Sequence, residues 1–258
     1  MVFGLWPQAG PRTPRIMAAA ALTFALSLLM ACAQGGATGA TAPGTRADNT
    51  PLKAGAGSGA NACVPVTDAI EKVRSSVVRI ETPPDGKGEV SAGTGFVIGS
   101  GVVLTNQHVV AGVPRVFATF FMTGRRAVGQ VVATNEAQDL ALIQVDTATI
   151  PPVIWGDDRA LSKGTPLAAI GYAGDRRGPP AVSQGTYLQT YVDPPTGQAY
   201  LLSDVALEHG DSGGPLLNQC GQVVGVNTAK IRSEDRAGLS IPEFLAQRWA
   251  TQQIQQQH

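Results

Sequence analysis

Apolar segments of strand length, separated by Gly and Pro residues, recur along most of this chain. They cover residues 77–80, 94–98, 102–105, 116–121, 128–134, 140–145, 167–172, 182–189, 200–203, 215–217 and 223–228. Segments this short are typical of strands rather than helices, and the 31 Gly and 18 Pro supply many turns. Because many short strands with frequent turns form barrels or sandwiches, the pattern predicts an all-β fold.

One serine, Ser212, stands inside a glycine-rich run, Gly210-Asp211-Ser212-Gly213-Gly214-Pro215. Glycines let the backbone turn sharply and bring its N–H groups close to a ligand. A serine hydroxyl is a useful nucleophile only with a base beside it and with donors for the oxyanion that forms. The run also fits the nucleophile elbow of α/β-hydrolases, which need an acid and then a histidine after the serine. Only His258, the last residue, follows Ser212, and a chain terminus cannot hold a catalytic base in place, so we exclude that fold.

Two segments before this run supply a candidate base and a candidate orienting carboxylate. His108 stands three residues after Thr105, the end of the predicted strand 102–105, and Asp139 directly precedes the predicted strand 140–145. Of the three histidines, His258 is terminal and His209 lies on the loop expected to hold the oxyanion. His108 is therefore the candidate base, and the alternative role for Asp139 is a carboxylate that caps a strand.

The order His108, Asp139, Ser212 resembles the chymotrypsin-fold serine peptidases, and more closely their bacterial HtrA/Deg branch. The segment 92–98, Ala-Gly-Thr-Gly-Phe-Val-Ile, is similar to the strand that leads to the catalytic histidine in that branch. Three more segments are similar to the opening of the nucleophile loop and to the closing strands: 204–206, 224–229 and 238–242. The resemblance implies two six-stranded antiparallel β-barrels with the site in the cleft between them.

The domain organisation follows from that resemblance. The first barrel is expected over about residues 63–152 and the second over about 153–242. A short helix is expected at 68–74, and a terminal helix at 243–258 with a packing face made by Phe244, Leu245 and Trp249. Because only this helix follows the second barrel, the domain is expected without the PDZ domain that is common in the HtrA branch.

The resemblance also implies a role for each site residue. His108 takes the proton of Ser212, Asp139 holds the imidazole, and the backbone N–H groups of Gly210 and Ser212 hold the oxyanion. The substrate pocket is expected at Ala206, His209 and Thr228, with Ala206 at its base. No metal and no cofactor are needed, and no Cys/His cluster has the spacing of metal ligands.

Asp211 departs from the HtrA branch, which usually has Asn at this position, and Glu208-His209 replaces a common Asn-Pro. In trypsin-like zymogens the equivalent aspartate pairs with a newly cut N-terminus, and no matching segment stands near Cys63. We therefore expect Asp211 to bind Arg176, Arg177 or N–H groups of its own loop without activation cleavage. The alternative is a side chain that points to solvent.

The first 62 residues predict export. Arg12 and Arg15 precede an apolar run over 16–31, which together form a signal-peptide pattern. The run ends in Leu-Met-Ala-Cys, which resembles a lipobox with Cys32 as the lipidated residue; ordinary cleavage after Ala33 and an uncut anchor are the alternatives. Residues 32–62 are rich in Gly, Ala and Thr and are expected to form a flexible tether.

Cys63 and Cys220 remain, and in an oxidising compartment they are expected to form a disulfide; two separate buried thiols are the alternative. The net charge is zero, so nothing favours nucleic acid as a partner.

The leading hypothesis is an exported serine endopeptidase with protein or peptide substrates and a membrane anchor. The rival is a non-catalytic polypeptide-binding module on the same fold, and an esterase is a lesser variant. The sequence makes no prediction of oligomeric state.

Overall fold

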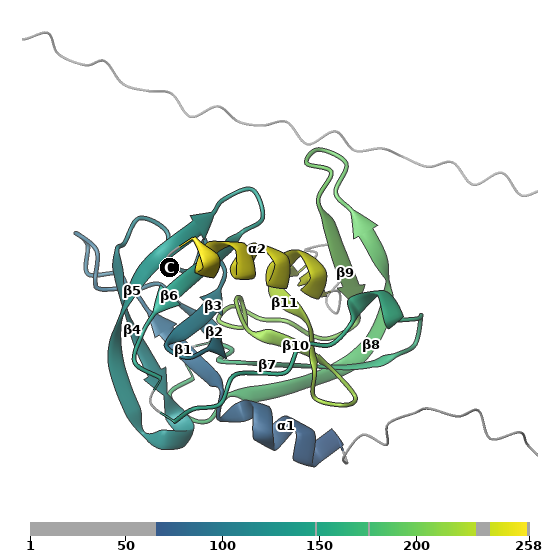
Figure 1. Cartoon of the computed structure of the whole chain (residues 1–258), viewed down its shortest axis with the longest axis horizontal. Coiled ribbons are helices and arrows are strands. Elements are labelled where there is room, and N and C mark those ends of the chain that lie inside the picture. Colours follow the sequence, from purple (N-terminus) through teal and green to yellow (C-terminus); the bar gives the residue numbers. More distant parts are fainter. Residues whose placement is uncertain (1–65, 148, 175, 231–237, 257–258) are drawn as a thin grey trace, which may run out of the picture. The chain divides into compact units, whose positions relative to one another are not determined.

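The computed structural model describes residues 66–147, 149–174, 176–230 and 238–256, all of which lie in one compact unit, Gly57–His258. Its elements are α1 (Val66–Arg74), β1 (Val77–Glu81), β2 (Ala92–Gly99), β3 (Val102–Thr105), β4 (Arg115–Phe120), η1 (Phe121–Thr123), β5 (Arg125–Asn135), β6 (Leu140–Gln144), η2 (Asp158–Ala160), β7 (Pro166–Gly171), β8 (Ala181–Val192), β9 (Ala199–Ser203), β10 (Pro215–Asn218), β11 (Val223–Lys230), β12 (Gly238–Pro242) and α2 (Glu243–Gln255). The strands gather into two groups, with the two helices packed beside them (Figure 1).

Each group of strands closes into a barrel. The first has the order β1-β2-β3-β6-β5-β4, and β1 pairs with β4 to close it. The second has the order β10-β11-β12-β9-β8-β7, and β10 pairs with β7. All of these pairs are antiparallel. The two six-stranded antiparallel barrels and the C-terminal helix confirm the fold that the sequence predicted.

Side-chain burial explains why the strands lie where they do. In β4 the side chains of Val116, Ala118 and Phe120 are buried and alternate with more exposed neighbours, as expected for a strand with one face toward a core. Strand β2 differs, because consecutive residues are buried on both of its faces. Val97 packs in the core of the first barrel, whereas Phe96 packs in a cluster shared with the second barrel. Strand β2 therefore lies at the junction of the two barrels.

Three apolar clusters form the core. One lies inside the first barrel and one inside the second. The third, which we call the shared cluster, joins Phe96 and Leu142 of the first barrel to Ile170 and Val226 of the second and to Trp249 of α2. Full burial of an aliphatic or aromatic side chain of this size contributes roughly 1.5–3 kcal/mol. Packing of the shared cluster thus fixes how the two barrels sit against each other.

Helix α2 packs on β11 and β12, and the prediction of its packing face was wrong for one residue, Phe244. Trp249 is buried and Leu245 half-buried, whereas Phe244 is 43% exposed. The buried face also includes Ala246 and Ala250. Trp249 lies three residues after Ala246 and Ala250 four residues after it, so the three side chains share one side of the helix. Phe244 projects from the opposite side, because each residue turns the helix by about 100°.

Cys220, which follows β10, is disulfide-bonded. Its expected partner, Cys63, lies outside the described residues, and so do the signal segment 1–31, the lipidation candidate Cys32 and the tether 32–62. Those expectations stay predictions. Among the helices that the structure describes, none has the length and apolar character needed to cross a membrane.

Candidate active site

The ends of two paired strands bring His108 and Asp139 together. Strands β3 and β6 are antiparallel, with Thr105 opposite Ala141. The chain that leaves β3 and the chain that enters β6 therefore meet at the same edge of the barrel. Asn106, which is fully buried, ties the two segments, because its side-chain Nδ2 donates to the backbone carbonyl of Asp139 at 2.9 Å.

Asp139 accepts hydrogen bonds from both the backbone and the ring of His108. The His108 N–H lies 3.0 Å from Oδ1, and the ring Nδ1 lies 2.9 Å from Oδ2. Asp139 has a φ of 54°, in the left-handed region that residues other than glycine seldom adopt, and the hydrogen bonds hold it there. Because Nδ1 faces the carboxylate, the proton of a neutral imidazole lies on Nδ1, and Nε2 is left as the acceptor.

Hydrogen bonds affect the pKa of Asp139 more strongly than burial does. Desolvation by burial would raise the pKa of Asp139, but hydrogen bonds from His108 and Thr228 lower it below its ordinary value of 3.8. The carboxylate is therefore ionised at neutral pH, as a group that must stabilise an imidazolium needs to be.

Thr228, on β11, connects the carboxylate to the serine. Its hydroxyl Oγ1 donates to Asp139 Oδ2 at 2.5 Å, and its backbone carbonyl accepts from Ser212 Oγ at 3.2 Å. Among the described residues, the Ser212 hydroxyl donates to this carbonyl and makes no hydrogen bond with His108. The structure thus brings His108, Asp139 and Ser212 to one place through Thr228, which was expected only as a pocket residue.

The loop that carries Ser212 is held against the first barrel by Thr94 of β2. The Thr94 N–H donates to the Ser212 carbonyl at 2.8 Å, and its hydroxyl donates to the Gly210 carbonyl at 2.6 Å. The same hydroxyl accepts from the Tyr172 N–H at 3.0 Å. Thr94 is fully buried, so these hydrogen bonds do not compete with water.

Two glycines of the loop meet backbone from other segments. Gly210 has a φ of 97°, and a Cβ there would lie 2.2 Å from the Tyr172 carbonyl oxygen. Gly213 has a φ of 84°, and a Cβ there would lie 2.2 Å from the Thr94 carbonyl oxygen. Both positions therefore need glycine for conformation and for space.

The peptide between His209 and Gly210 has a defined orientation. The His209 carbonyl accepts from the Gly174 N–H at 2.6 Å, and no peptide bond in the described residues is cis. In a trans peptide the N–H points opposite to the carbonyl, so the Gly210 N–H points away from Gly174. In the described part of the chain, neither the Gly210 N–H nor the Ser212 N–H has an acceptor. One of these N–H groups belongs to the serine itself and the other lies two residues before it, on half-exposed backbone that a ligand can reach.

Asp211 is 4% exposed and accepts from the Glu208 N–H at 3.0 Å, so it has a partner in its own loop, as one of the sequence alternatives expected. Neither Arg176 nor Arg177 donates a hydrogen bond to it among the described residues. Desolvation by burial raises the pKa of Asp211 to about 6, against the lowering effects of the Glu208 hydrogen bond and of the Arg176 charge.

The remaining pocket residues lie at the surface. Ala206 is exposed between the buried Val205 and Leu207, and His209 is exposed as well. In the described residues, no group of three or more His, Cys, Asp or Glu side chains is arranged to hold a metal ion.

Sequence reasoning missed the roles of Thr94, Asn106 and the Thr228 hydroxyl. Thr94 and Thr228 stand in segments that the resemblance singled out, but their partners lie far away in the sequence. Asn106 offered a local signal, since it is a polar side chain at the end of an apolar strand.

Comparisons with known proteins identify the family of this domain. The family described as trypsin-like peptidase domain matches residues 93–226. A Chlamydia muridarum protein named "Probable periplasmic serine endoprotease DegP-like" is 30% identical over 67% of this chain and 36% of its own length. Mitochondrial serine protease HTRA2 of Bos taurus is 31% identical over 65% of this chain and 39% of its own length. The solved structure of the HtrA-type protease AlgW with a tripeptide has a TM-score of 0.66 and 26% identity, over 72% of this chain and 62% of that chain.

The chain spans about two fifths of the length of these curated relatives, at 36% and 39%. The likeness therefore concerns the peptidase domain.

Replacing Asp211 with Asn is expected to stabilise the protein in a pH-dependent way. The folded pKa of Asp211, about 6, lies above the ordinary value of 3.8, so the folded state binds the proton more tightly. The contribution of this carboxyl to stability is then fully present below about pH 4 and is lost as pH rises through about 6. Asp211→Asn, which can still accept from Glu208, should exceed the parent protein in stability at pH 8 by up to about 3 kcal/mol, and by much less at pH 4.

Urea unfolding at pH 4, 6 and 8, with both proteins carrying Ser212→Ala to prevent self-digestion, measures this difference. Glu89→Gln, which removes an exposed carboxylate, is the matched control and should show no such trend. A stability difference that is the same at all three pH values would contradict the assignment.

Proposed function

The chain belongs to the family of trypsin-like peptidase domains, and on this premise we propose that it is an exported serine endopeptidase. It hydrolyses peptide bonds of envelope or extracellular proteins through an acyl-enzyme. One observation carries the proposal: the His108 ring faces the carboxylate of Asp139 beside a serine loop whose two N–H groups have no acceptor among the described residues. An imidazole with a free Nε2, a nearby hydroxyl and two unpaired donors are what acyl transfer requires.

In the proposed reaction, Nε2 of His108 takes the proton of Ser212 as Oγ forms a bond to the peptide carbonyl carbon. The carbonyl oxygen gains negative charge, which the N–H groups of Gly210 and Ser212 stabilise by about 3 kcal/mol per donor. His108 then gives the proton to the leaving amine as the C–N bond breaks. Water, activated in the same way, releases the acid product from the acyl-enzyme.

The Ser212 hydroxyl must first leave the Thr228 carbonyl, to which it donates at 3.2 Å. A rotation about the Cα–Cβ bond of Ser212 is the smallest movement that turns Oγ toward His108, and such rotations connect ordinary side-chain rotamers. Asp139 keeps its three hydrogen bonds throughout, so the base stays oriented while the nucleophile moves.

For substrate choice, we propose small or medium aliphatic residues before the scissile bond. Ala206, the residue assigned to the base of the pocket, is an exposed methyl group without charge, and it offers no partner for Lys or Arg. His209 and Thr228 complete the pocket. Cleavage of a peptide library reports the preference directly, and a strong preference for Lys or Arg at this position would reject the assignment.

Export rests on the signal pattern of residues 1–31 and on the DegP-like relative, which is named as periplasmic. We propose a lipid anchor at Cys32, followed by the tether 32–62. The mass of the mature N-terminal peptide distinguishes a lipidated Cys32 from cleavage after Ala33. An unmodified N-terminal segment that still begins at Met1 would reject both forms of processing.

The rival function is a non-catalytic module that binds polypeptides on the same fold. It predicts that the serine is unreactive, whereas the endopeptidase needs Ser212, His108 and the oxyanion donors together. Covalent labelling by a fluorophosphonate probe, followed by hydrolysis of peptide and ester substrates, separates endopeptidase, esterase and binding module.

Ser212→Ala and His108→Ala are each expected to abolish probe labelling and to lower peptide hydrolysis by at least about a thousandfold, because the three groups act as a unit. Asp139→Asn should also cost orders of magnitude, since it favours the wrong imidazole tautomer. Ser100→Ala, at an exposed serine outside the site, is the matched control. Near-normal turnover by the Ser212 or His108 variant would remove the endopeptidase assignment.

Thr228→Val is expected to lower kcat by about tenfold with little change in KM. The substitution removes the hydroxyl that donates to Asp139 but keeps the backbone carbonyl and the side-chain shape, and a hydrogen bond to a charged group is worth roughly 1.5–3 kcal/mol. Thr228→Ser, which keeps the hydroxyl, should stay within about threefold of the parent rate. Steady-state kinetics on one peptide checks both, and equal rates for the Val and Ser variants would show that the hydroxyl does not position Asp139.

A further inference from the structure

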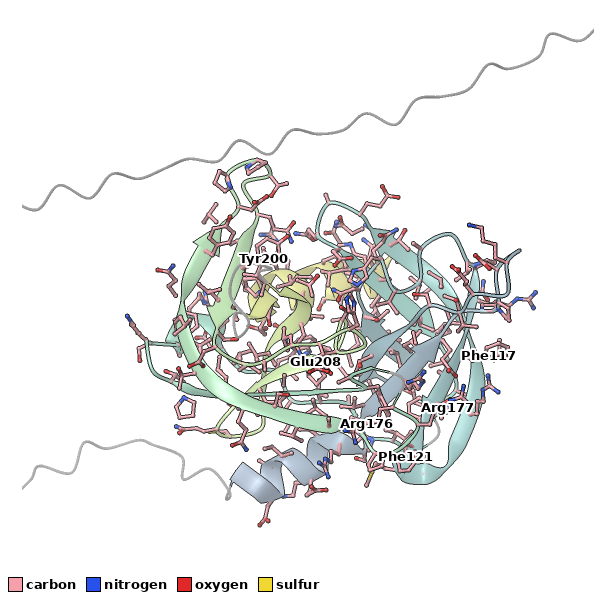
Figure 2. The ribbon with its side chains drawn as sticks, turned by 180° about the vertical axis from the view of Figure 1, so that it is seen from behind. Phe117, Phe121, Arg176, Arg177, Tyr200 and Glu208 are labelled. Atoms are coloured by element: carbon pink, nitrogen blue, oxygen red, sulfur yellow. The ribbon has the colours of Figure 1, made fainter. Side chains whose placement is uncertain are left out.

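A basic pocket lies outside the candidate active site, between the first barrel and the segment that follows β7. Its volume is about 370 Å³. Among the described residues, its lining contains four arginines, namely Arg79, Arg126, Arg176 and Arg177, and one carboxylate, Glu81. Figure 2 shows Arg176 and Arg177 grouped with Phe121 on one side of the molecule, with Glu208 of the serine loop farther toward its middle. Since the whole chain has a net charge of zero, this is a local concentration of positive charge.

The Glu81 carboxylate is already shared by two arginines. Glu81 lies 3.2 Å from a terminal nitrogen of Arg79 and 3.9 Å from one of Arg126. Arg126 is also fixed by Phe117, with its guanidinium carbon 4.4 Å from the ring centroid. Within the described residues, the side chains of Arg176 and Arg177 form no ion pair. Among the described lining residues, the positive charges of Arg176 and Arg177 are thus not balanced by an ion pair.

Two buried donors of the pocket lack acceptors as well. Tyr172 is 2% exposed, and among the described residues its hydroxyl has no acceptor for its proton, although a hydrogen bond with the Phe121 backbone acts to lower its pKa. Arg79 is 7% exposed, and its Nε has no partner, although another of its nitrogens donates to the Arg176 carbonyl at 2.8 Å. Leaving a buried donor unpaired costs about 1–3 kcal/mol. Desolvation by burial raises the pKa of Tyr172 to about 12, so its hydroxyl keeps its proton and can donate.

We propose that this pocket binds an oxyanion of the phosphate or carboxylate type. Guanidinium groups and a protonated phenol are donors only, and they match the several acceptor oxygens of such a head group. The planar guanidinium of arginine suits two-point contact with these anions better than an ammonium group does. The ligand receives charge from the exposed Arg176 and Arg177. The Tyr172 hydroxyl and the Arg79 Nε are closed to solvent in this structure, so they donate to the ligand after the side chains that cover them have moved aside.

Phe121 indicates that the head group is part of an organic molecule. It lines the pocket and is 41% exposed, so its ring offers apolar surface beside the arginines. A phosphate or carboxylate carried on an apolar group would bury this ring, whereas a free inorganic anion would leave it in water.

Binding can be measured without relying on catalysis. The full chain carrying Ser212→Ala is titrated by calorimetry with inorganic phosphate, phenyl phosphate, acetate and benzoate, at constant ionic strength set by chloride. We expect saturable binding of at least one anion, with the phenyl form about three to ten times tighter than the simple anion of the same head group, from burial of the ring. Equal affinity for the two forms would reject the contact with Phe121 and identify a free anion as the ligand.

Two variants test the residues. Tyr172→Phe removes one hydroxyl and Arg177→Gln removes one exposed charge; each should weaken binding, by about tenfold for Tyr172→Phe, which loses a hydrogen bond to a charged group. Arg248→Gln, at an exposed arginine on α2, is the matched control and should bind as the parent does. Because the buried Tyr172 hydroxyl has no acceptor, the Tyr172→Phe variant should melt at about the same temperature as the parent protein. If it melts at a lower temperature, the anion affinity of the Arg177→Gln variant tests the proposal instead. Absence of saturable binding, or binding that neither variant weakens, would overturn the proposal.

Discussion

The hydrogen bonds of Thr94 hold the two barrels in the relation that the site requires. Its backbone N–H and its hydroxyl reach the carbonyls of Ser212 and Gly210, so one residue of β2 fixes two positions of the serine loop. Through the same hydroxyl, Tyr172 is tied to that loop from the other side. Apolar packing brings the barrels together, but it tolerates small sliding movements. Buried hydrogen bonds with defined directions restrict those movements, because each one lost would leave an unpaired group.

Much of the fold could be predicted from local sequence. Short apolar runs between turn residues marked strands such as β3, whose bounds were predicted as observed, and the family resemblance supplied the closure into barrels. His108, Asp139 and Ser212 could be found because each stands in a distinctive run. The contacts of Thr94 and Thr228 could not, because each joins residues that are distant in sequence and adjacent only after both barrels have formed.

Phe244 was misplaced for a related reason. As a large apolar residue it was assigned to the packing face of the terminal helix, but the direction in which α2 packs is set by Trp249 and by small residues that let the helix approach β11.

Asp211 shows the opposite situation. A carboxylate beside Ser212 suggested a partner, and among the described residues the Asp211 carboxylate accepts from one backbone N–H, which leaves most of the cost of its burial uncompensated. The buried carboxylate of Asp211 is thus kept at some cost to the stability of the folded state.

The shared cluster has a consequence for the order of events during synthesis. Its members come from β2 and β6, from the strands of the second barrel and finally from Trp249 of α2, which follows both barrels in the chain. A nascent chain that lacks α2 cannot complete this cluster, so the packing that joins the two barrels reaches its final form only once α2 has been added. The arrangement of His108, Asp139 and Ser212 therefore reaches its final form only after translation has passed the second barrel.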